Sequence, residues 1–250
     1  MVPTVPIYTA DQVRAAERPL LDAGEPLMRR AASALAAIVR ERIADAPAPR
    51  IRVLAGGGDN GGDALYAAAE LAAVAHVDVL TVGGRVHELA LGAALRAVAR
   101  RIDLPSAVAE ASRYAVVVDG IVGIGSSPDP SLRGAARDAV AQLLPPLREG
   151  MPRIVAVDIP SGLHPDTGDA DDVVLPAAVT VTFGAVKAGL VAGRGPELSG
   201  DVVLVDLGLG PGLAGEEPAG EASVSRVVDA QALPRPRQPG EKPPPPRAAE

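Results

Sequence analysis

Residues 51–63 read IRVLAGGGDNGGD, a short apolar run followed by a glycine-rich turn. The run predicts a buried β-strand and the alanine-rich stretch after it predicts a helix, so the segment opens a βαβ unit. Five glycines among residues 56–63 permit positive φ angles and let backbone amides approach a ligand closely. Because a helix N-terminus favours anions, the turn is predicted to hold a phosphate. A glycine-rich turn without a ligand is the alternative.

The same alternation continues along the chain and predicts a parallel sheet. Strands are predicted for residues 52–55, 77–82, 115–119, 154–158, 179–183 and 202–205. Helices are predicted for residues 63–74, 86–101 and 131–144, the last stopped by Pro145 and Pro146. The expected fold class is α/β, a Rossmann-like three-layer α/β/α sandwich with a mostly parallel sheet. Right-handed crossovers would place the strand carboxyl ends on one ligand-binding edge.

Two helices are predicted before this alternation. Thr9 and Gln12 form a capping box for a helix over residues 10–21, which must tolerate Pro19 or end near it. Apolar residues at helical spacing from Leu27 to Ile43 predict a second, packing helix. Residues 1–232 are predicted to form one domain. Residues 233–250 are rich in proline and predict a disordered tail or linker.

Composition excludes several classes of function. A net charge of -7 and a pI near 5.1 give no long-range attraction for nucleic acid or anionic membrane. Without cysteine there is no thiolate nucleophile, thiolate metal site or disulfide framework. The N-terminal residues show no leader pattern, and no apolar run reaches membrane-spanning length. We therefore expect a cytoplasmic protein with no nucleic-acid or membrane partner.

The glycine turn alone does not identify a dehydrogenase. Gly56, Gly58 and Gly61 have the G-x-G-x-x-G spacing of dinucleotide-binding folds. An NAD-dependent dehydrogenase would also place Asp or Glu at the end of the second strand, where residues 82–85 read VGGR. A P-loop is excluded, because no Gly-Lys-Ser/Thr follows the glycines.

Three further polar groups follow predicted strands. Asp119 and Asp158 each end an apolar run, where Asp also serves as a turn or cap residue, and Ser161 follows Asp158 closely. A serine hydrolase is disfavoured, because the G-x-S-x-G motif is absent. Lys187 follows another strand; a lone lysine is usually solvated, but its place at the ligand edge favours a site.

Other titratable residues fit no predicted site. His76 and His87 are predicted to lie on the surface and His164 in a solvated loop. The acidic run over residues 166–172 lacks the spacing of an EF-hand and also predicts a solvated loop.

The glycine turn and the segments that carry Asp119, Asp158 and Lys187 follow one another in the chain. In this order they resemble the NAD(P)H-hydrate epimerase family, also called the YjeF N-terminal domain, over about residues 9–208. The family's motifs are similar to GNNGGDG, DALFGTG, VDIPSG and TFGxxK, and residues 27–28 resemble the LM of its N-terminal helix. The resemblance implies epimerisation of hydrated NADH and NADPH (NAD(P)HX) between R and S forms at C6 of the nicotinamide ring. It also implies a homodimer and a possible dehydratase domain or partner.

The resemblance also implies roles for single residues. Contacts to the dinucleotide would come from Asp59, Asn60, Gly61, Gly62, Asp63, Gly123, Ile124, Gly125, Ser126, Ser127, Pro128 and Asp129. Potassium would be held by Asn60, Asp119 and Ser161. Asp158 would contact the hydrated nicotinamide and act as acid/base, with Lys187 as an electrostatic partner. A partly desolvated carboxylate serves both as donor and acceptor when burial raises its pKa.

The chain departs from the family pattern at three positions. Asp59 stands in place of Asn, Ile124 in place of Thr and Ala64 in place of Gly. Asp59 adds negative charge beside the predicted phosphate site, which favours the alternative of a catalytically silent binding or scaffold module, as in mRNA-decapping relatives. Asp158 and Lys187 favour the enzyme. A nicotinamide-dependent oxidoreductase is the third hypothesis.

Overall fold

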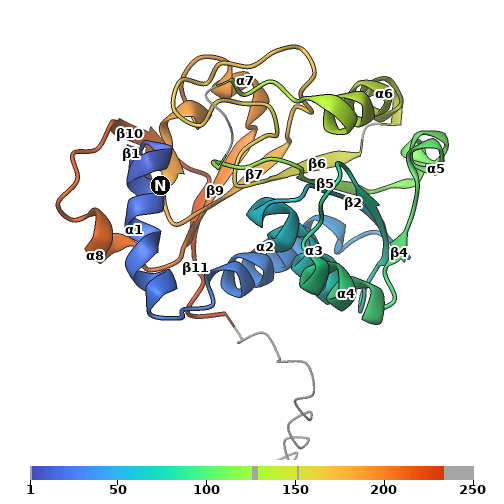
Figure 1. Ribbon diagram of the computed structural model, residues 1–250, viewed down its shortest axis with the longest axis horizontal. Coiled ribbons are helices and arrows are strands. Elements are labelled where there is room, and N and C mark those ends of the chain that lie inside the picture. Colours follow the sequence, from blue (N-terminus) through green and yellow to red (C-terminus); the bar gives the residue numbers. More distant parts are fainter. Residues whose placement is uncertain (1, 126–128, 151, 234–250) are drawn as a thin grey trace, which may run out of the picture.

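The computed structural model describes residues 2–125, 129–150 and 152–233, which form a large sheet covered by helices (Figure 1). Eight strands have the order β11-β9-β7-β6-β5-β2-β3-β4, and every neighbouring pair is parallel. They are β2 (Arg50–Ala55), β3 (His76–Thr81), β4 (Arg100–Arg101), β5 (Val116–Gly120), β6 (Arg153–Val157), β7 (Val179–Phe183), β9 (Asp201–Asp206) and β11 (Arg226–Asp229). All six predicted strands are present, within two residues of the predicted bounds.

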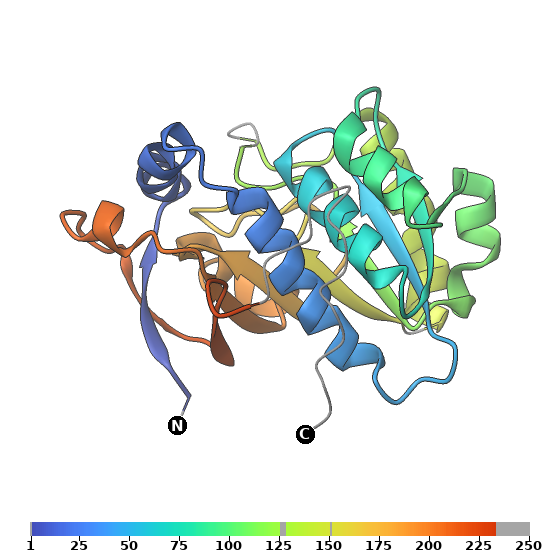
Figure 2. The ribbon, with the colours of Figure 1, turned by 90° about the horizontal axis from the view of Figure 1, so that it is seen from below.

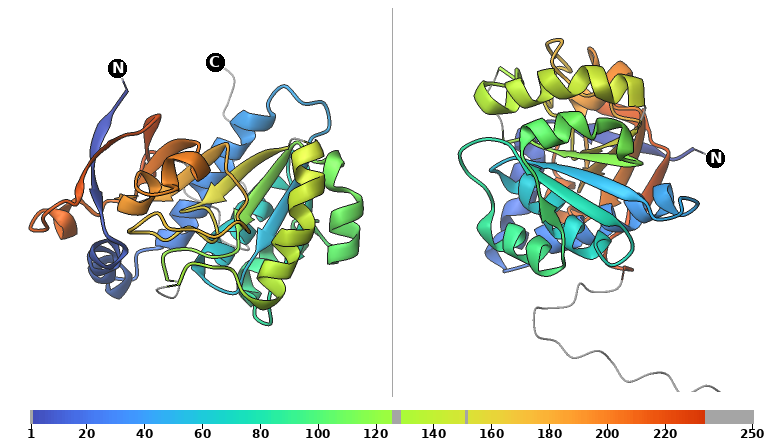
Figure 3. Two further views of the ribbon diagram at one scale, coloured as in Figure 1. Left: turned by 90° about the horizontal axis from the view of Figure 1, so that it is seen from above. Right: turned by 90° about the vertical axis from the view of Figure 1, so that its right-hand side faces the viewer.

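Helices lie on both faces of the large sheet, as the right panel of Figure 3 shows. One face is covered by α2 (Leu27–Ile43), α3 (Asp59–Leu71) and α4 (Glu88–Arg96), whose buried side chains share a core with Ile51 and Val53. The other face is covered by α5 (Leu104–Ala109) and α6 (Gly134–Gly150), whose core includes Leu54 and Val117. The predicted three-layer α/β/α fold is confirmed.

The direction of strand addition reverses at β2. The chain adds β3 and β4 on one side of β2 and then returns to place β5 on its other side. Ala55 and Gly120 pair at the carboxyl end of this junction. Because crossovers leave in opposite directions there, such a reversal opens a crevice where open α/β sheets bind ligands.

A second, three-stranded sheet was not predicted. It has the order β10-β1-β8, formed by β10 (Gly220–Ser223), β1 (Thr4–Tyr8) and β8 (Val186–Lys187). Figure 2 shows β1 and the following helix α1 (Ala10–Asp22) at one end of the large sheet. Tyr8 of β1 pairs in register with Lys187 of β8. The small sheet therefore fixes α1 beside the carboxyl edge of the large sheet.

The capping box at the start of α1 is confirmed. Thr9 Oγ1 accepts a hydrogen bond from Gln12 N at 3.3 Å, and Gln12 Oε1 accepts one from Thr9 N at 3.0 Å. The helix tolerates Pro19 because the carbonyl group it leaves without a donor belongs to Ala15, which is exposed to water.

The prediction that Pro145 and Pro146 stop a helix is wrong. Both prolines lie inside α6, which continues to Gly150. The carbonyl groups that lose their donors belong to Ala141 and Gln142, which are exposed, so water satisfies them. The predicted helix over residues 86–101 is too long, because Val98 has a φ of 65° and residues 100–101 form β4.

Short helical turns complete the described chain. They are η1 (Ala111–Arg113), η2 (Ala188–Leu190), α7 (Gly195–Leu198) and α8 (Gly210–Leu213). Among the described helices, none combines the length and the hydropathy needed to cross a bilayer. The predicted proline-rich tail lies outside the described residues from residue 234 onward.

A cluster around Asp78 connects the strands at the other edge of the sheet. Asp78 accepts hydrogen bonds from Arg50 at 2.9 Å, Arg100 at 2.7 Å and the Tyr114 hydroxyl at 2.6 Å. Burial alone would raise the pKa of Asp78, but these hydrogen bonds outweigh it and lower the pKa to about 2. Beside them the Arg52 guanidinium lies 3.9 Å from the centre of the Tyr114 ring.

We predict that Asp78→Asn destabilises the fold by about 1–2 kcal/mol at pH 7, a range that allows for the exposure of Arg100. Since the folded pKa is about 2 and the ordinary value is 3.8, the charged carboxylate stabilises the fold above pH 3.8. That contribution is lost as the pH falls through 2. Urea unfolding between pH 2 and pH 7 measures the difference, with the exposed Asp45→Asn as control. An equal midpoint for wild type and Asp78→Asn at pH 7 contradicts the prediction.

Candidate functional site

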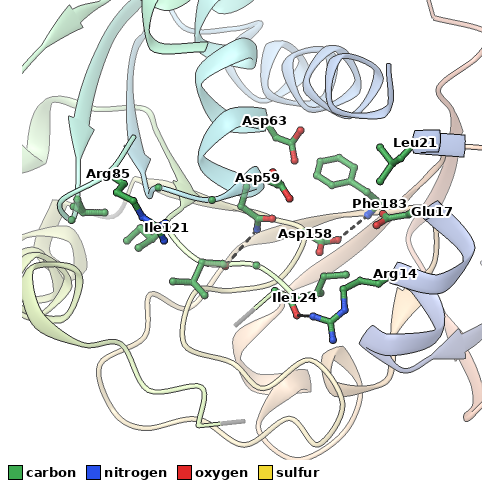
Figure 4. A pocket seen from close by; sticks show the side chains of 18 of the residues that line it. Arg14, Glu17, Leu21, Asp59, Asp63, Arg85, Ile121, Ile124, Asp158 and Phe183 are labelled. Atoms are coloured by element: carbon green, nitrogen blue, oxygen red, sulfur yellow. Dashed lines mark hydrogen bonds between the residues drawn. The ribbon is translucent and has the colours of Figure 1, made fainter. Parts of the chain in front are cut away.

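A cavity of about 710 Å³ opens at the carboxyl edge of the sheet, where the strand order reverses. Figure 4 shows its walls, which come from the turn after β2, the loops after β3 and β5, the ends of β6 and β7, and α1. The lining residues are Arg14, Glu17, Arg18, Leu21, Gly57, Gly58, Asp59, Asn60, Asp63, Val82, Gly83, Gly84, Arg85, Ile121, Val122, Gly123, Ile124, Gly125, Asp158 and Phe183. Residues distant in sequence therefore share one space.

The glycine turn after β2 is tighter than predicted. Helix α3 begins at Asp59, so residues 59–63 form its first turn and not a loop. None of the glycines in this turn has a positive φ. Gly56 and Gly61 are required by close packing, because a Cβ on Gly56 would lie 1.9 Å from Ile121 O and one on Gly61 would lie 2.0 Å from Gly56 O.

The N-terminus of α3 faces this cavity with its backbone groups available. Gly58 is the N-cap and makes no side-chain capping hydrogen bond. The first amides of a helix have no partner within the helix, and the helix dipole adds partial positive charge there. The turn can therefore bind an anion, as the sequence predicts.

The three residues predicted to hold potassium lie together. The Ser161 hydroxyl donates to Asp119 Oδ1 at 2.6 Å and accepts from Val122 N at 2.9 Å, while Ser161 N donates to Asp119 Oδ2 at 2.9 Å. Asn60 Nδ2 donates to Val157 O at 2.5 Å and to Val122 O at 3.4 Å. Side-chain and carbonyl oxygens thus converge beneath the cavity from α3 and the ends of β5 and β6.

Burial makes Asp119 the unusual member of this cluster. Its side chain is 1% exposed, and burial raises its pKa although hydrogen bonds from Ser161 and Ile121 oppose the shift. Within the described chain no basic side chain pairs with Asp119. A buried carboxylate without a basic partner, next to the Ser161 hydroxyl, which itself lies 3.3 Å from Val122 O, is a suitable environment for a hard monovalent cation.

Asp158 lies at the floor of the cavity in an uncommon backbone conformation. Its φ is 68°, in the left-handed region that a residue with a side chain rarely adopts. Asp158 Oδ1 accepts hydrogen bonds from Phe183 N at 3.1 Å and from Thr182 Oγ1 at 3.3 Å. Such a strained conformation persists only where the surroundings hold it, and it is common at functional sites.

Lys187 pairs with Asp158 and is buried with it. Its ammonium group donates to Asp158 Oδ1, and also to Phe183 O at 2.7 Å. Lys187 is 1% exposed, so the usual interpretation of a lone lysine as solvated does not apply here. The pairing of β8 with β1 brings Lys187 to this position.

The structure places some of the predicted dinucleotide contacts at the cavity and others elsewhere. Gly123, Ile124 and Gly125 line the cavity, together with Asp59, Asn60 and Asp63. Gly61 and Gly62 belong to the same helical turn. Ser126, Ser127 and Pro128 lie outside the described residues. Asp129 does not line the cavity, and its carboxylate accepts hydrogen bonds from Arg133 and Ser131.

The contribution of α1 to the cavity was not predicted. Arg14 and Glu17 line it, and Figure 4 shows both side chains on the wall opposite Asp59. Arg14 donates to Ile124 O at 3.0 Å. Burial raises the pKa of Glu17, with Lys187 opposing the shift and Asp158 adding to it. The capping box predicted the helix, but its position depends on the unpredicted small sheet.

Asp63 is a second buried carboxylate of the cavity wall. It is 6% exposed, and Oδ1 has no hydrogen-bond partner among the described residues. Burial raises the pKa of Asp63 well above its ordinary value, and the nearby Asp158, Asp59 and Glu17 raise it further. Asp63 therefore favours the protonated, uncharged form in the folded chain.

Two of the three histidines make structural hydrogen bonds, and His76 is exposed as predicted. His87 caps α4 by accepting from Ala90 N, and His164 Nδ1 accepts from Asp166 N and Thr167 N. The prediction of a solvated acidic loop is wrong for Asp166, because its carboxylate accepts a hydrogen bond from Ala10 N at 2.6 Å. This contact holds the start of α1 against the loop.

Comparison with known proteins gives consistent matches. The family model of the YjeF-related protein N-terminus matches residues 24–189. The NAD(P)H-hydrate epimerase of Microbacterium testaceum is 57% identical over 224 residues, which cover 89% of this chain and 86% of that protein. The NAD(P)H-hydrate epimerase of Clavibacter michiganensis is 50% identical, covering 81% of this chain and 90% of that protein.

Two further matches concern a longer protein and a fold. The bifunctional NAD(P)H-hydrate repair enzyme Nnr of Mycobacterium tuberculosis is 40% identical, and the match covers 81% of this chain but 41% of that enzyme. The crystal structure of yeast ynu0 has a TM-score of 0.65 at 19% identity, covering 74% of this chain and 83% of that one. At this low identity, the similarity to the yeast structure supports the fold and nothing further.

We predict that Asp63→Asn raises the thermal midpoint by about 2–4 °C at pH 7.5, the shift that roughly 1 kcal/mol produces in a chain of this size. The folded pKa lies above the ordinary value of 3.8, so keeping Asp63 uncharged favours folding and this advantage is lost as the pH rises. At pH 3.5, below the ordinary value, the carboxyl is mostly protonated in both states, and the two midpoints should nearly agree. Calorimetry measures both, with the exposed Asp138→Asn as control. A lower midpoint for Asp63→Asn at pH 7.5 would refute the interpretation.

Proposed function

The chain belongs to the family of the YjeF-related protein N-terminus, and on this premise we propose that it is an NAD(P)H-hydrate epimerase. It interconverts the R and S forms of hydrated NADH and NADPH at C6 of the nicotinamide ring, and it is an isomerase. One observation carries the proposal: the buried pair of Asp158 and Lys187 at the floor of a cavity large enough for part of a dinucleotide. The similar proteins bearing that name support it.

The chemistry at C6 requires proton transfer. The carbon carries a hydroxyl group beside the ring nitrogen, so its configuration is lost either by ring opening or by loss of water to an iminium. Both routes need a proton donor and a proton acceptor close to C6. No electron is gained or lost, so the dinucleotide is the substrate and no hydride acceptor takes part.

Asp158 is the residue we assign to this proton transfer. Within the described chain Asp158 accepts hydrogen bonds on Oδ1, from Lys187, Phe183 and Thr182, which leaves Oδ2 for the substrate. The fixed backbone and the ion pair hold the carboxylate in one orientation. Lys187 would stabilise the negative charge of Asp158 between proton transfers.

Potassium fits the oxygen cluster beneath the cavity. Asn60, Asp119 and Ser161 would hold it, since a hard cation prefers oxygen ligands and buried Asp119 has no basic partner in the described chain. When bound, the ion offsets negative charge near the substrate. It also joins α3 to the loops after β5 and β6, which carry these residues.

The dinucleotide phosphates would bind at the N-terminus of α3. Asp59 is exposed in the first turn, where its charge stabilises the helix dipole but repels a phosphate. Affinity should therefore be lower than an uncharged residue at this position would give. The homodimer, the cytoplasmic location and a dehydratase partner that consumes the S form stay predictions.

The alternative is a catalytically silent module of the same fold. The Asp59 substitution favours it, whereas the buried Asp158–Lys187 pair favours the enzyme, because a binding module has no need of a desolvated charge pair. An oxidoreductase would oxidise or reduce the bound dinucleotide when a hydride acceptor is supplied, and the proposed isomerase does not.

We predict that purified wild-type chain epimerises R-NADHX and that Asp158→Asn lowers kcat at least 100-fold with little change in KM, the usual size of a general acid–base contribution. Chromatographic separation of the two epimers over time measures the rates. Asp201→Asn, at the exposed start of β9, is the matched control and should retain full activity. Equilibration by the wild type no faster than in buffer would rule out the enzyme and support the scaffold module.

We also predict that replacing potassium with tetramethylammonium removes most of the activity, and that Ser161→Ala raises the potassium concentration for half-maximal rate at least tenfold. Binding to the folded state alone raises stability, so potassium should also raise the thermal midpoint of the wild type. The midpoint of Ser161→Ala should respond only at higher potassium concentration. Equal midpoints and rates in both salts would show that the cluster holds no potassium.

A further inference from the structure

The end of the cavity away from Asp158 is formed by the loop after β3. Val82, Gly83, Gly84 and Arg85 line this end, next to Gly57 and Gly58 of the glycine turn. Strands β2 and β3 are neighbours and end together, since Ala55 pairs with Thr81. The loop after β3 therefore lies beside the proposed phosphate site.

Arg85 is packed directly against the glycine turn. A Cβ on Gly57 would lie 3.0 Å from Arg85 Cβ and 3.0 Å from Arg85 O, so glycine at position 57 allows this approach. Figure 4 shows the Arg85 side chain extending into the cavity toward Ile121. A ligand with its phosphates on the N-terminus of α3 would have its next sugar within reach of Arg85.

The positive charge of Arg85 is available to a ligand. It is exposed, and its guanidinium makes no hydrogen bond or ion pair with any described residue. Arg14, by contrast, already donates to Ile124 O and pairs with Asp11. The carboxylates Asp158 and Glu17 belong to the other walls, from β6 and α1.

Dinucleotide folds use the residue after the second strand to recognise the adenosine ribose. An Asp or Glu there hydrogen-bonds to the free 2′-hydroxyl, whereas an arginine accommodates a 2′-phosphate. Residues 82–85 contain no acid and end in Arg85. The planar guanidinium can donate two parallel hydrogen bonds to phosphate oxygens, which adds geometric selectivity to the charge attraction.

We propose that Arg85 forms a subsite for a 2′-phosphate on the adenosine ribose, so that the chain selects the phosphorylated dinucleotide over the unphosphorylated one. The identity of the full substrate, NADPHX over NADHX, rests on the proposed function. The subsite itself does not, because nucleotide fragments that undergo no reaction can occupy it.

Binding of 2′,5′-ADP and 5′-AMP to the whole chain, measured by isothermal titration calorimetry, tests the subsite. The wild type should bind 2′,5′-ADP at least tenfold more tightly than 5′-AMP. Arg85→Ala should reduce that ratio to twofold or less while leaving the affinity for 5′-AMP nearly unchanged. Arg18→Ala removes an equal charge from the α1 wall of the same cavity and should preserve the ratio.

The outcomes separate this proposal from the proposed function. The ratio of kcat/KM for NADPHX and NADHX should fall in Arg85→Ala as the fragment ratio does. Tighter binding of 2′,5′-ADP by a chain without epimerase activity supports the subsite and overturns the enzyme. An active chain that binds both fragments equally, or whose preference survives Arg85→Ala, overturns the subsite.

Discussion

The ion pair between Lys187 and Asp158 is buried where the two sheets meet, and the arrangement of the site depends on it. Removing two charges from water is costly, and their attraction compensates only when further hydrogen bonds satisfy both groups. Here Phe183 supplies both, its N–H to Asp158 and its carbonyl oxygen to Lys187. Because Lys187 lies on β8, which pairs with β1, the same contact holds α1 over the carboxyl ends of β6 and β7.

The charge of the cavity is lower than its composition suggests. Four carboxylates line it, yet burial raises the pKa of Glu17 and Asp63, and Asp158 is neutralised by Lys187. Each raised pKa favours the uncharged carboxyl form and so weakens the repulsion of an anionic dinucleotide. Carboxyl groups held in such different environments divide acid and base roles among themselves. The proposed proton chemistry and anion binding would therefore share one space.

Sequence reasoning found the large sheet because buried parallel strands are continuous apolar runs that helices separate. The grouping of Asn60, Asp119 and Ser161 came from the family resemblance, and the three lie together because each follows a strand of that sheet. The small sheet was not predicted, because β1 pairs with β10, more than 200 residues later, and β8 has only two residues. Glu17 could not be recognised as a cavity residue without that pairing. Nor could Pro145 and Pro146 be placed inside α6 without knowing that their side of the helix faces water.

The two ends of the cavity differ in a way that sets the direction of a bound dinucleotide. Asp158, Glu17 and Asp63 surround one end, and Arg85 stands at the other. In the reverse orientation a 2′-phosphate would lie beside the Asp158–Lys187 pair, away from Arg85, and would lose the charge-assisted hydrogen bonds that a guanidinium can donate. The nicotinamide ring carries no such charge and can lie against Asp158. Attraction at the Arg85 end therefore favours the orientation that would bring C6 to Asp158, the proposed acid–base residue.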